Sequence, residues 1–276
     1  MKHLYLIALL GVLCATVSTA PDAVAEDCDA TCLAKRAQDP LANVKALMTD
    51  NAVALRTGRG NDKPAYNFQL QPVYSIPTES WTFIPRGIIP IVGAPGSAGI
   101  PKLGTEPVAQ GETKWGLGDS IFQLFMTPKT DGDFKIGFGP QVGLKTHTNK
   151  RSAGHGWGGG LVGIAFGNAG NLAYGGIVNH MWGEDGFSLS GVQPMIMYNF
   201  ESIPGLYVGY NNSITYDWNA KAGDRWQVPL GAMIGKTIPI GTGGQALDLQ
   251  LGAYGMAAKP TGGADAEVRF GVSMFF

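Results

Sequence analysis

From residue 64 to the end, the sequence is dominated by apolar residues that alternate with polar ones at a period of two. Between residues 134 and 144, for example, Phe134, Ile136 and Phe138 share one parity, while Lys135 and Gln141 share the other. This period is typical of a β-strand with one apolar and one polar face. Clusters of Gly, Asn, Asp and Pro separate the alternating segments, which is where turns are expected. The pattern therefore predicts an all-β protein built from many strands.

The first 25 residues have the features of an export signal. A positive start, Met1-Lys2-His3, precedes an apolar stretch over residues 4–17, and Ala23-Val24-Ala25 provides a small-x-small cleavage site. A transmembrane helix is the alternative interpretation, but the apolar stretch is shorter than the roughly 20 residues that a span needs. Pro21 also follows it closely. We therefore expect residues 1–25 to be a signal peptide.

The remainder of the chain contains no apolar run of about 18 residues, so it lacks a candidate membrane helix. Charged residues make up only 15% of the sequence, against about 25% in typical soluble domains. The formal net charge of −1 argues against a nucleic-acid-binding protein, which would carry a basic excess. An apolar chain with few charges is typical of a protein that faces lipid. If it spans a membrane by strands, it must do so as a closed barrel, because every backbone group must be paired.

The turn signals divide the chain into segments long enough to cross a membrane at a tilt. A twelfth strand is expected in the weaker stretch 44–57, since bacterial single-chain barrels have even strand counts. Alternatively, that stretch is a helix or plug and the count is ten. The clearer strands are predicted at 66–74, 80–91, 115–127, 133–145, 157–168, 172–182, 187–200, 205–218, 225–239, 246–258 and 264–276.

Connections and aromatic residues support the same architecture. Long loops are expected at 92–114 and 146–156, and they alternate with short turns, as in outer-membrane barrels. Aromatic residues near the strand ends are consistent with girdles at the two membrane interfaces. A soluble β-sandwich is the competing fold, but its strands are usually shorter. We predict a transmembrane antiparallel up-and-down β-barrel, and the terminal Phe276 is the candidate signal for the barrel assembly machinery.

Polar residues at the alternate strand positions that face the barrel interior are the candidates for a substrate pathway. A charge on the lipid face near the midplane would cost about 2–4 kcal/mol. The alternative is that they only pair with one another across a filled interior. Met195, Met197 and Met233 share the same parity and predict a partly apolar lumen. The polar candidates are Asp119, Gln123, Lys135, Gln141, Gln193, Asn199, Asp217, Arg225, Asp248, Glu267 and Arg269.

Other chemistry is weakly represented. Cys28 and Cys32 are candidates for a local disulfide in an oxidising compartment, with two free thiols as the alternative. His147 and Ser152 fall in one predicted loop and are the candidate histidine–serine pair. The sequence predicts no catalytic residues, no metal site and no cofactor, since neither metal-ligand spacing nor a nucleotide-binding context is present.

Several short phrases occur in a specific order along almost the whole mature chain. They are DPLAN at 39–43, WGLGDS at 115–120, FGP at 138–140, VNHMW at 178–182, QPMIMYN at 193–199, DW at 217–218 and DRWQVPLG at 224–231. In these phrases the sequence resembles a family of Gram-negative outer-membrane, transporter-like barrels associated with the meta-pathway of phenol degradation. The resemblance implies passage of small organic, including aromatic, compounds, and it implies no catalytic residues.

Together these features predict a porin-like channel for passive transport of small, hydrophobic or aromatic organic molecules in the cell outer membrane. The alternative is a closed structural or adhesive barrel. Three regions are expected: the signal peptide at 1–25, an N-terminal segment at 26–63 that is a tail, a plug or the first strand, and the barrel at 64–276. The expected partners are outer-membrane lipid, the barrel assembly machinery and a small organic solute, and no nucleic acid.

Overall fold

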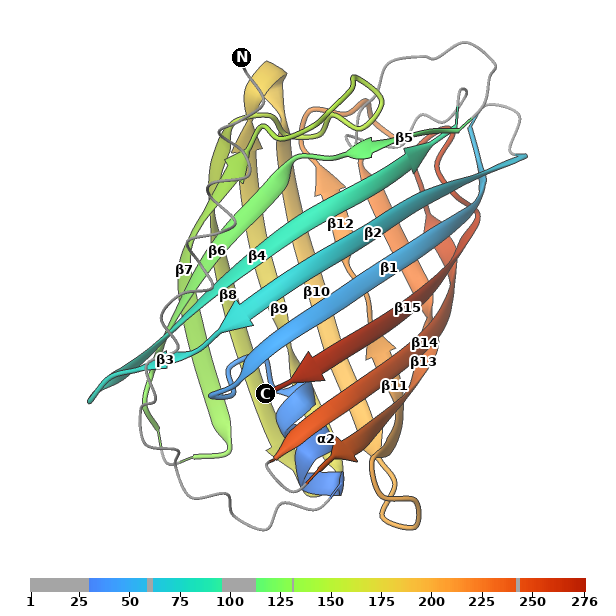
Figure 1. The fold of residues 1–276 in the computed structure, drawn as a ribbon. Coiled ribbons are helices and arrows are strands. Elements are labelled where there is room, and N and C mark those ends of the chain that lie inside the picture. Colours follow the sequence, from blue (N-terminus) through green and yellow to red (C-terminus); the bar gives the residue numbers. More distant parts are fainter. Residues whose placement is uncertain (1–29, 59–61, 96–112, 131, 242–243) are drawn as a thin grey trace.

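The computed structural model describes residues 30–58, 62–95, 113–130, 132–241 and 244–276. Within these ranges the strands form one antiparallel sheet that closes on itself as a barrel (Figure 1). The fifteen strand segments of this described part form twelve barrel strands, because three pairs of consecutive segments each lie in line. The predicted fold class and the count of twelve are therefore confirmed.

The elements follow one another around the barrel in chain order. After the helix α2 (Ala30–Gln38), they are β1 (Lys45–Thr57), β2 (Lys63–Tyr74), β3 (Ile76–Pro77), β4 (Trp81–Ala94), β5 (Lys114–Leu117), β6 (Ser120–Pro128), β7 (Phe134–Leu144), β8 (Gly158–Ala169), β9 (Leu172–Gly183), the 3₁₀ turn η1 (Glu184–Gly186), β10 (Ser188–Asn199), β11 (Leu206–Asn211), β12 (Ile214–Asp217), β13 (Trp226–Ile240), β14 (Gln245–Ala258) and β15 (Ala266–Phe275).

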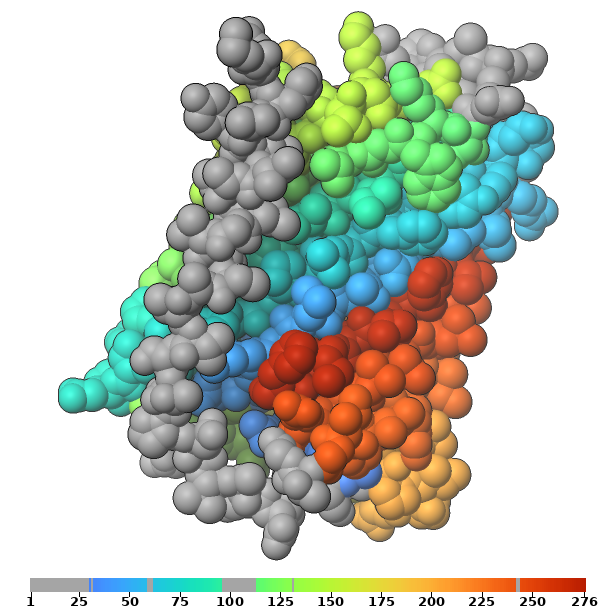
Figure 2. Space-filling view, viewed as in Figure 1, coloured from blue at the N-terminus to red at the C-terminus, as the bar shows by residue number. Residues whose placement is uncertain are grey.

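Pairing of the first and last strands closes the barrel. β1 pairs with β2 on one side and with β15 on the other, where Ala46 lies opposite Phe275 and Leu55 opposite Ala266. Figure 2 shows this seam from outside, with the red residues of β15 against the blue residues of β1. Closure pairs each of the twelve barrel strands of the described ranges with a neighbour on each side, which is what a spanning sheet requires.

The weak stretch at 44–57 is the strand β1 rather than a helix, so the ten-strand alternative is wrong. Two predicted strands differ in detail from the observed ones. The segment 115–127 is interrupted at Gly118 and Asp119 between β5 and β6, and the segment 205–218 is interrupted at Asn212 and Ser213 between β11 and β12. Both interruptions occur where side chains of the break bond to neighbouring segments, as described below for Asp119.

The N-terminal segment adds a helix at one end of the barrel. α2 lies beside β13, β14 and β10 (Figure 1), and its Leu33 packs with Ala46, Ala246 and Phe275. Residues 1–25, the predicted signal peptide, and Cys28 lie outside the described residues. Cys32 is disulfide-bonded. No helix among the described residues is long and apolar enough to cross a membrane.

The two faces of the wall have opposite chemistry. Outward-facing side chains are large and apolar on nearly every strand; Phe138 is 53% exposed and Leu251 is 55% exposed, for example. Inward-facing side chains such as Asp248, Gln141 and Asn199 are buried and polar. A water-soluble protein has the reverse arrangement. The wall is therefore built to face lipid outside and a polar interior inside.

Aromatic side chains mark both ends of this apolar surface. Trp115, Trp157, Trp182, Trp218 and Trp226 lie at strand ends on the side of the long loops. At the opposite ends lie Tyr74, Trp81, Phe134, Tyr174 and Tyr198, which are also exposed. Two aromatic girdles separated by an apolar band are typical of membrane barrels.

Candidate functional site: the barrel lumen

The lumen contains two adjoining cavities of about 1140 Å³ and 1600 Å³, part of that space being open to solvent. Both cavities are lined by Asp50, Gln71, Arg86, Gln193 and Arg269. These side chains therefore form a belt between a lower chamber, next to α2, and an upper chamber, next to Thr57 and the turn at Gly262 and Gly263. Any solute that crosses the barrel through its lumen must pass this belt.

The lower chamber is mainly apolar. Met195, Met197 and Met233 are buried and line it, together with Ile84 and Phe125. Methionine is flexible and polarisable, so these side chains can adapt to apolar molecules of different shapes and can contact aromatic rings favourably. The predicted partly apolar interior is found at this level of the barrel.

The upper chamber has a different lining. Asn67, Gln69, Gln123, Asn179 and Gln227 contribute amide groups to it. Gln123 donates a hydrogen bond from Nε2 to Gln141 Oε1 at 2.8 Å. Apolar side chains such as Ile88 and Val92 also line the upper chamber, so it differs from the lower one in carrying more amide groups.

Charged groups at the belt are unequally paired. Arg269 donates from Nη2 to Asp50 Oδ1 at 2.6 Å, lies 3.6 Å from Glu267 Oε1, and also donates to Asn212. Asn212 in turn donates to Glu267 at 2.5 Å. Arg269 is thus held between two carboxylates, which fixes its position in the lumen and neutralises its charge locally.

Arg86, the other cation of the belt, has a single hydrogen bond in the described part of the chain, from Nη2 to Gln71 Oε1 at 2.5 Å. Its Nε atom is buried and has no hydrogen-bond partner there. Gln123, its cross-strand neighbour in β6, bonds to Gln141 instead. Most of the donors of this guanidinium are therefore unused by the residues that the structure describes.

The end of α2 forms the floor of the lower chamber. Gln38 and Asn199 exchange two amide hydrogen bonds of 2.9 and 3.0 Å, and both residues are buried. Asp39, which follows the helix, forms an ion pair of 2.6 Å with Lys135 Nζ. Leu41 then enters the apolar core of the lumen. These contacts attach the N-terminal segment to the wall at β10 and β7.

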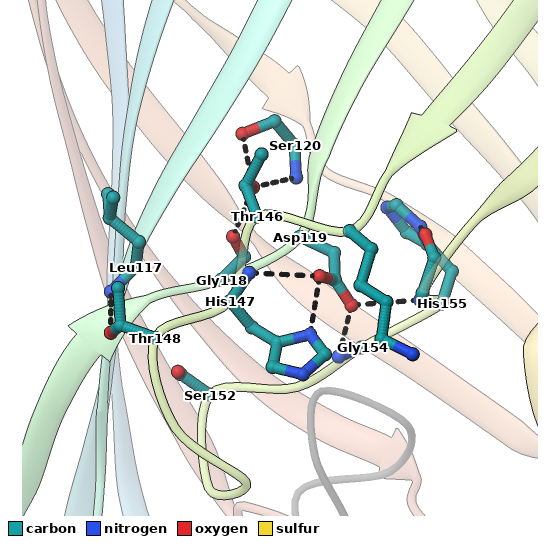
Figure 3. Close-up of polar contacts among 12 residues, drawn as sticks. Leu117, Gly118, Asp119, Ser120, Thr146, His147, Thr148, Ser152, Gly154 and His155 are labelled. Carbon is teal, nitrogen blue, oxygen red and sulfur yellow. Dashed lines mark hydrogen bonds and ion pairs between the residues drawn. The ribbon is translucent and has the colours of Figure 1, made fainter. Parts of the chain in front are cut away.

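At the opposite end, Asp119 fastens the loop 145–157 to the barrel rim (Figure 3). Its carboxylate accepts from His147 Nδ1 at 2.6 Å and from the backbone N–H groups of Gly154 and Gly156, each at 2.8 Å. Gly156 has a φ of 65°, a conformation that favours glycine. Burial alone would raise the pKa of Asp119, but these hydrogen bonds outweigh it, so the pKa lies below its ordinary value.

The predicted pathway residues fall into four groups. Gln193, Glu267, Arg269 and Gln123 line the cavities, whereas Lys135 and Asn199 bond to the N-terminal segment. Gln141 and Asp248 are buried partners within the wall; Asp248 accepts from Tyr207, Thr237 and Gln250. The remaining candidates, Asp119, Asp217 and Arg225, lie at the rim rather than on the cavity lining.

The rim positions have a physical cause. Asp217 accepts from the backbone N–H groups of Asn219 and Ala220 and so stabilises a turn. Arg225 is exposed and donates to Ala220 O and to Tyr216 Oη at 3.1 Å each. Both residues have inward parity, but they stand where the strands end, and the alternation no longer fixes side-chain direction there.

The structure also shows where the histidines and the serine considered for catalysis or metal binding lie. His147 faces Asp119, while the buried Ser152 donates from Oγ to Asn149 O at 3.1 Å. His180 faces outward and contacts Ser190 Oγ at 2.7 Å. Within the described ranges no three His, Cys, Asp or Glu side chains form a group that could hold a metal ion.

Several lumen residues were not predicted, namely Asp50, Gln71 and Arg86. Asp50 lies in β1, whose small and polar residues obscure the alternation. Arg86 is the only charged residue in the sequence of the segment 80–91, and a lone cation in an otherwise apolar strand is the signal that could have identified it.

No model of a known protein family matches the sequence, and no curated protein matches it. Solved structures do resemble it. An outer membrane channel from Pseudomonas putida F1 aligns over 85% of this chain and 96% of its own, with 14% identity and a TM-score of 0.58. This likeness shows a common fold.

Two further resemblances are weaker. A bacterial polysaccharide outer membrane secretin aligns over 85% of this chain and 98% of its own, with 10% identity and a TM-score of 0.40. OmpT, an outer membrane protein of Vibrio cholerae, aligns over 84% and 96%, with 10% identity and a TM-score of 0.37.

Proposed function

We propose that this protein is an outer-membrane channel that lets small organic molecules, including aromatic ones, pass through its lumen by diffusion. The observation that carries the proposal is the pair of cavities that meet at the belt and together follow the lumen from the turn at Gly262 and Gly263 to α2. The common fold with an outer membrane channel supports it.

The outer surface of the barrel supports a location in the membrane, and its loops and turns support an orientation. The apolar outer surface with two aromatic girdles favours insertion in a lipid bilayer. Outer-membrane barrels have short periplasmic turns and longer extracellular loops. We therefore place the end with α2 and the short turn 170–171 in the periplasm and the loop 145–157 outside the cell. The signal peptide proposed for residues 1–25 would direct export.

The chemistry of the lower chamber favours organic over purely polar solutes. Methionine side chains at Met195, Met197 and Met233 offer an adaptable apolar surface. A pore selective for inorganic ions would instead carry rings of one charge, whereas the belt holds both signs in Asp50, Arg86 and Arg269. The resemblance of the sequence to the phenol-degradation family supports aromatic compounds as solutes.

Planar-bilayer recording of the refolded mature protein tests the proposal. Discrete conductance steps that phenol alters at millimolar concentration would support a channel with organic solutes in its lumen. A protein that inserts, as shown by protection of its strands from protease, and yet remains electrically silent would contradict it.

The attached N-terminal segment favours a second candidate, a barrel that is closed in its resting state and has a structural role. Gln38 and Asp39 stand on the cavity lining and are bonded to the wall. Silent insertion that persists after the contacts of this segment are removed would support the closed barrel over the channel.

A further inference from the structure

The belt holds an arginine whose donors are largely unused, directly beside an apolar chamber. We propose that this site binds organic acids: the carboxylate of the solute bonds to Arg86, and its apolar body lies among the methionines of the lower chamber. The inference rests on the proposed channel function and names the class of solute.

The first argument is the hydrogen bonding of Arg86. A guanidinium has five N–H donors in a rigid plane, and only the bond to Gln71 is formed within the described residues. A buried donor without a partner is unfavourable, and the Nε atom of Arg86 is such a donor. A carboxylate matches the planar fork of a guanidinium with two parallel hydrogen bonds, so an organic acid would supply what the protein does not.

The second argument is the distribution of charge around it. Asp50 acts on Arg86 through space, but no carboxylate of the described chain lies within 4.0 Å of it. Asp50 bonds to Arg269 instead, and Glu267 lies beside the same Arg269. Asp50 and Glu267 are thus both occupied by Arg269, which leaves Arg86 available to a solute.

The third argument is what lies beside Arg86. The same cavity is lined by Arg86, Met195, Met197, Met233 and Phe125. One molecule can therefore contact the guanidinium and the apolar side chains at once.

Three probes separate the contributions of charge and ring. Benzoate carries both, acetate carries only the carboxylate, and benzyl alcohol carries only the ring. Isothermal titration of the detergent-solubilised, full mature protein should show benzoate binding at least tenfold more tightly than either of the others. Equal affinity for benzoate and benzyl alcohol would overturn the proposal.

Variants locate the site. Arg86→Gln should weaken benzoate binding at least tenfold and leave benzyl alcohol binding unchanged, whereas Arg225→Gln, at the exposed rim, should change neither. Benzoate affinity that is unchanged in Arg86→Gln would overturn the assignment. If Arg86→Gln does not fold, Arg86→Lys keeps the charge and loses the fork, and an unchanged affinity there would also overturn it.

The titration does not depend on conductance, so the two proposals can fail separately. Benzoate binding in a protein that is silent in bilayers would refute the channel and retain the site. Conductance that benzoate and benzyl alcohol affect equally would retain the channel and refute the site.

Discussion

Loss of the ion pair between Lys135 and Asp39 should loosen the N-terminal segment at the periplasmic end of the lumen. The Lys135 Nζ–Asp39 Oδ2 distance is 2.6 Å, and the side chains are 34% and 7% exposed. Removing one partner of a fully buried pair costs about 3–5 kcal/mol, and an exposed pair contributes only about 0.2–1 kcal/mol. For this half-buried pair we expect Lys135→Met to weaken docking of α2 by about 1–2 kcal/mol, since among the described residues the Asp39 carboxylate then keeps only the hydrogen bond from Leu41 N.

A loss of 1–2 kcal/mol raises the undocked population about 5- to 30-fold. Trypsin cleavage at Lys35 and Arg36 reports this population, because both sites lie inside α2 and a protease cuts only the locally opened segment. The initial rate of cleavage should rise by the same factor in Lys135→Met. The conductance of the proposed channel should rise with it, since the end of α2 forms the chamber floor.

Lys145→Met is the matched control, because Lys145 also forms a 2.6 Å pair with a carboxylate, Glu184, but in the loops at the opposite end. It should leave cleavage of α2 unchanged. Equal cleavage rates in wild type and Lys135→Met would refute the argument that this pair holds the segment. Faster cleavage without any change in conductance would show that the segment does not obstruct the lumen.

Three further predictions test the wall, the belt and the rim. Leu251→Arg should lower the free energy of unfolding by about 2–4 kcal/mol in lipid, whereas Gln250→Arg, its inward-facing neighbour, should cost much less; urea unfolding in vesicles measures both, and equal losses would contradict the assigned faces. Arg269→Ala should destabilise the barrel by about 2–4 kcal/mol because two carboxylates lose their shared partner, and an unchanged thermal unfolding temperature would contradict this. Because the pKa of Asp119 is lowered, its support of the loop is complete above about pH 4 and is lost as the pH falls through the lowered value; a spin label at Lys150→Cys should then become more mobile, and Asp119→Asn should remove that pH dependence.

Alternation predicted the wall well, because burial of one face against lipid and the other against the lumen fixes the direction of every side chain along a strand. The strand β14 is an example: Leu249 and Leu251 face outward, while Asp248 and Gln250 face inward. The same rule could not place Asp119 or Arg225, because they stand at strand ends. Turn geometry and local hydrogen bonds decide the direction of a side chain there.

The interior could be predicted only in part. Parity says which residues face the lumen, but the height at which each one lies depends on the register between strands and on barrel tilt. Arg86 and Arg269 line the same two cavities although they are 183 positions apart in the sequence (269 − 86). The docking of α2 likewise depends on contacts such as Gln38 with Asn199, which no local pattern encodes.

Chemical modification of a cysteine at the belt tests the central claim, that solutes pass through the lumen, most directly. Gln193 lines both cavities, and the adjacent Val192 is 45% exposed on the outer face. A charged methanethiosulfonate reagent should reduce the single-channel conductance of Gln193→Cys and leave that of Val192→Cys unchanged. Conductance that persists unaltered in modified Gln193→Cys would contradict passage through the lumen.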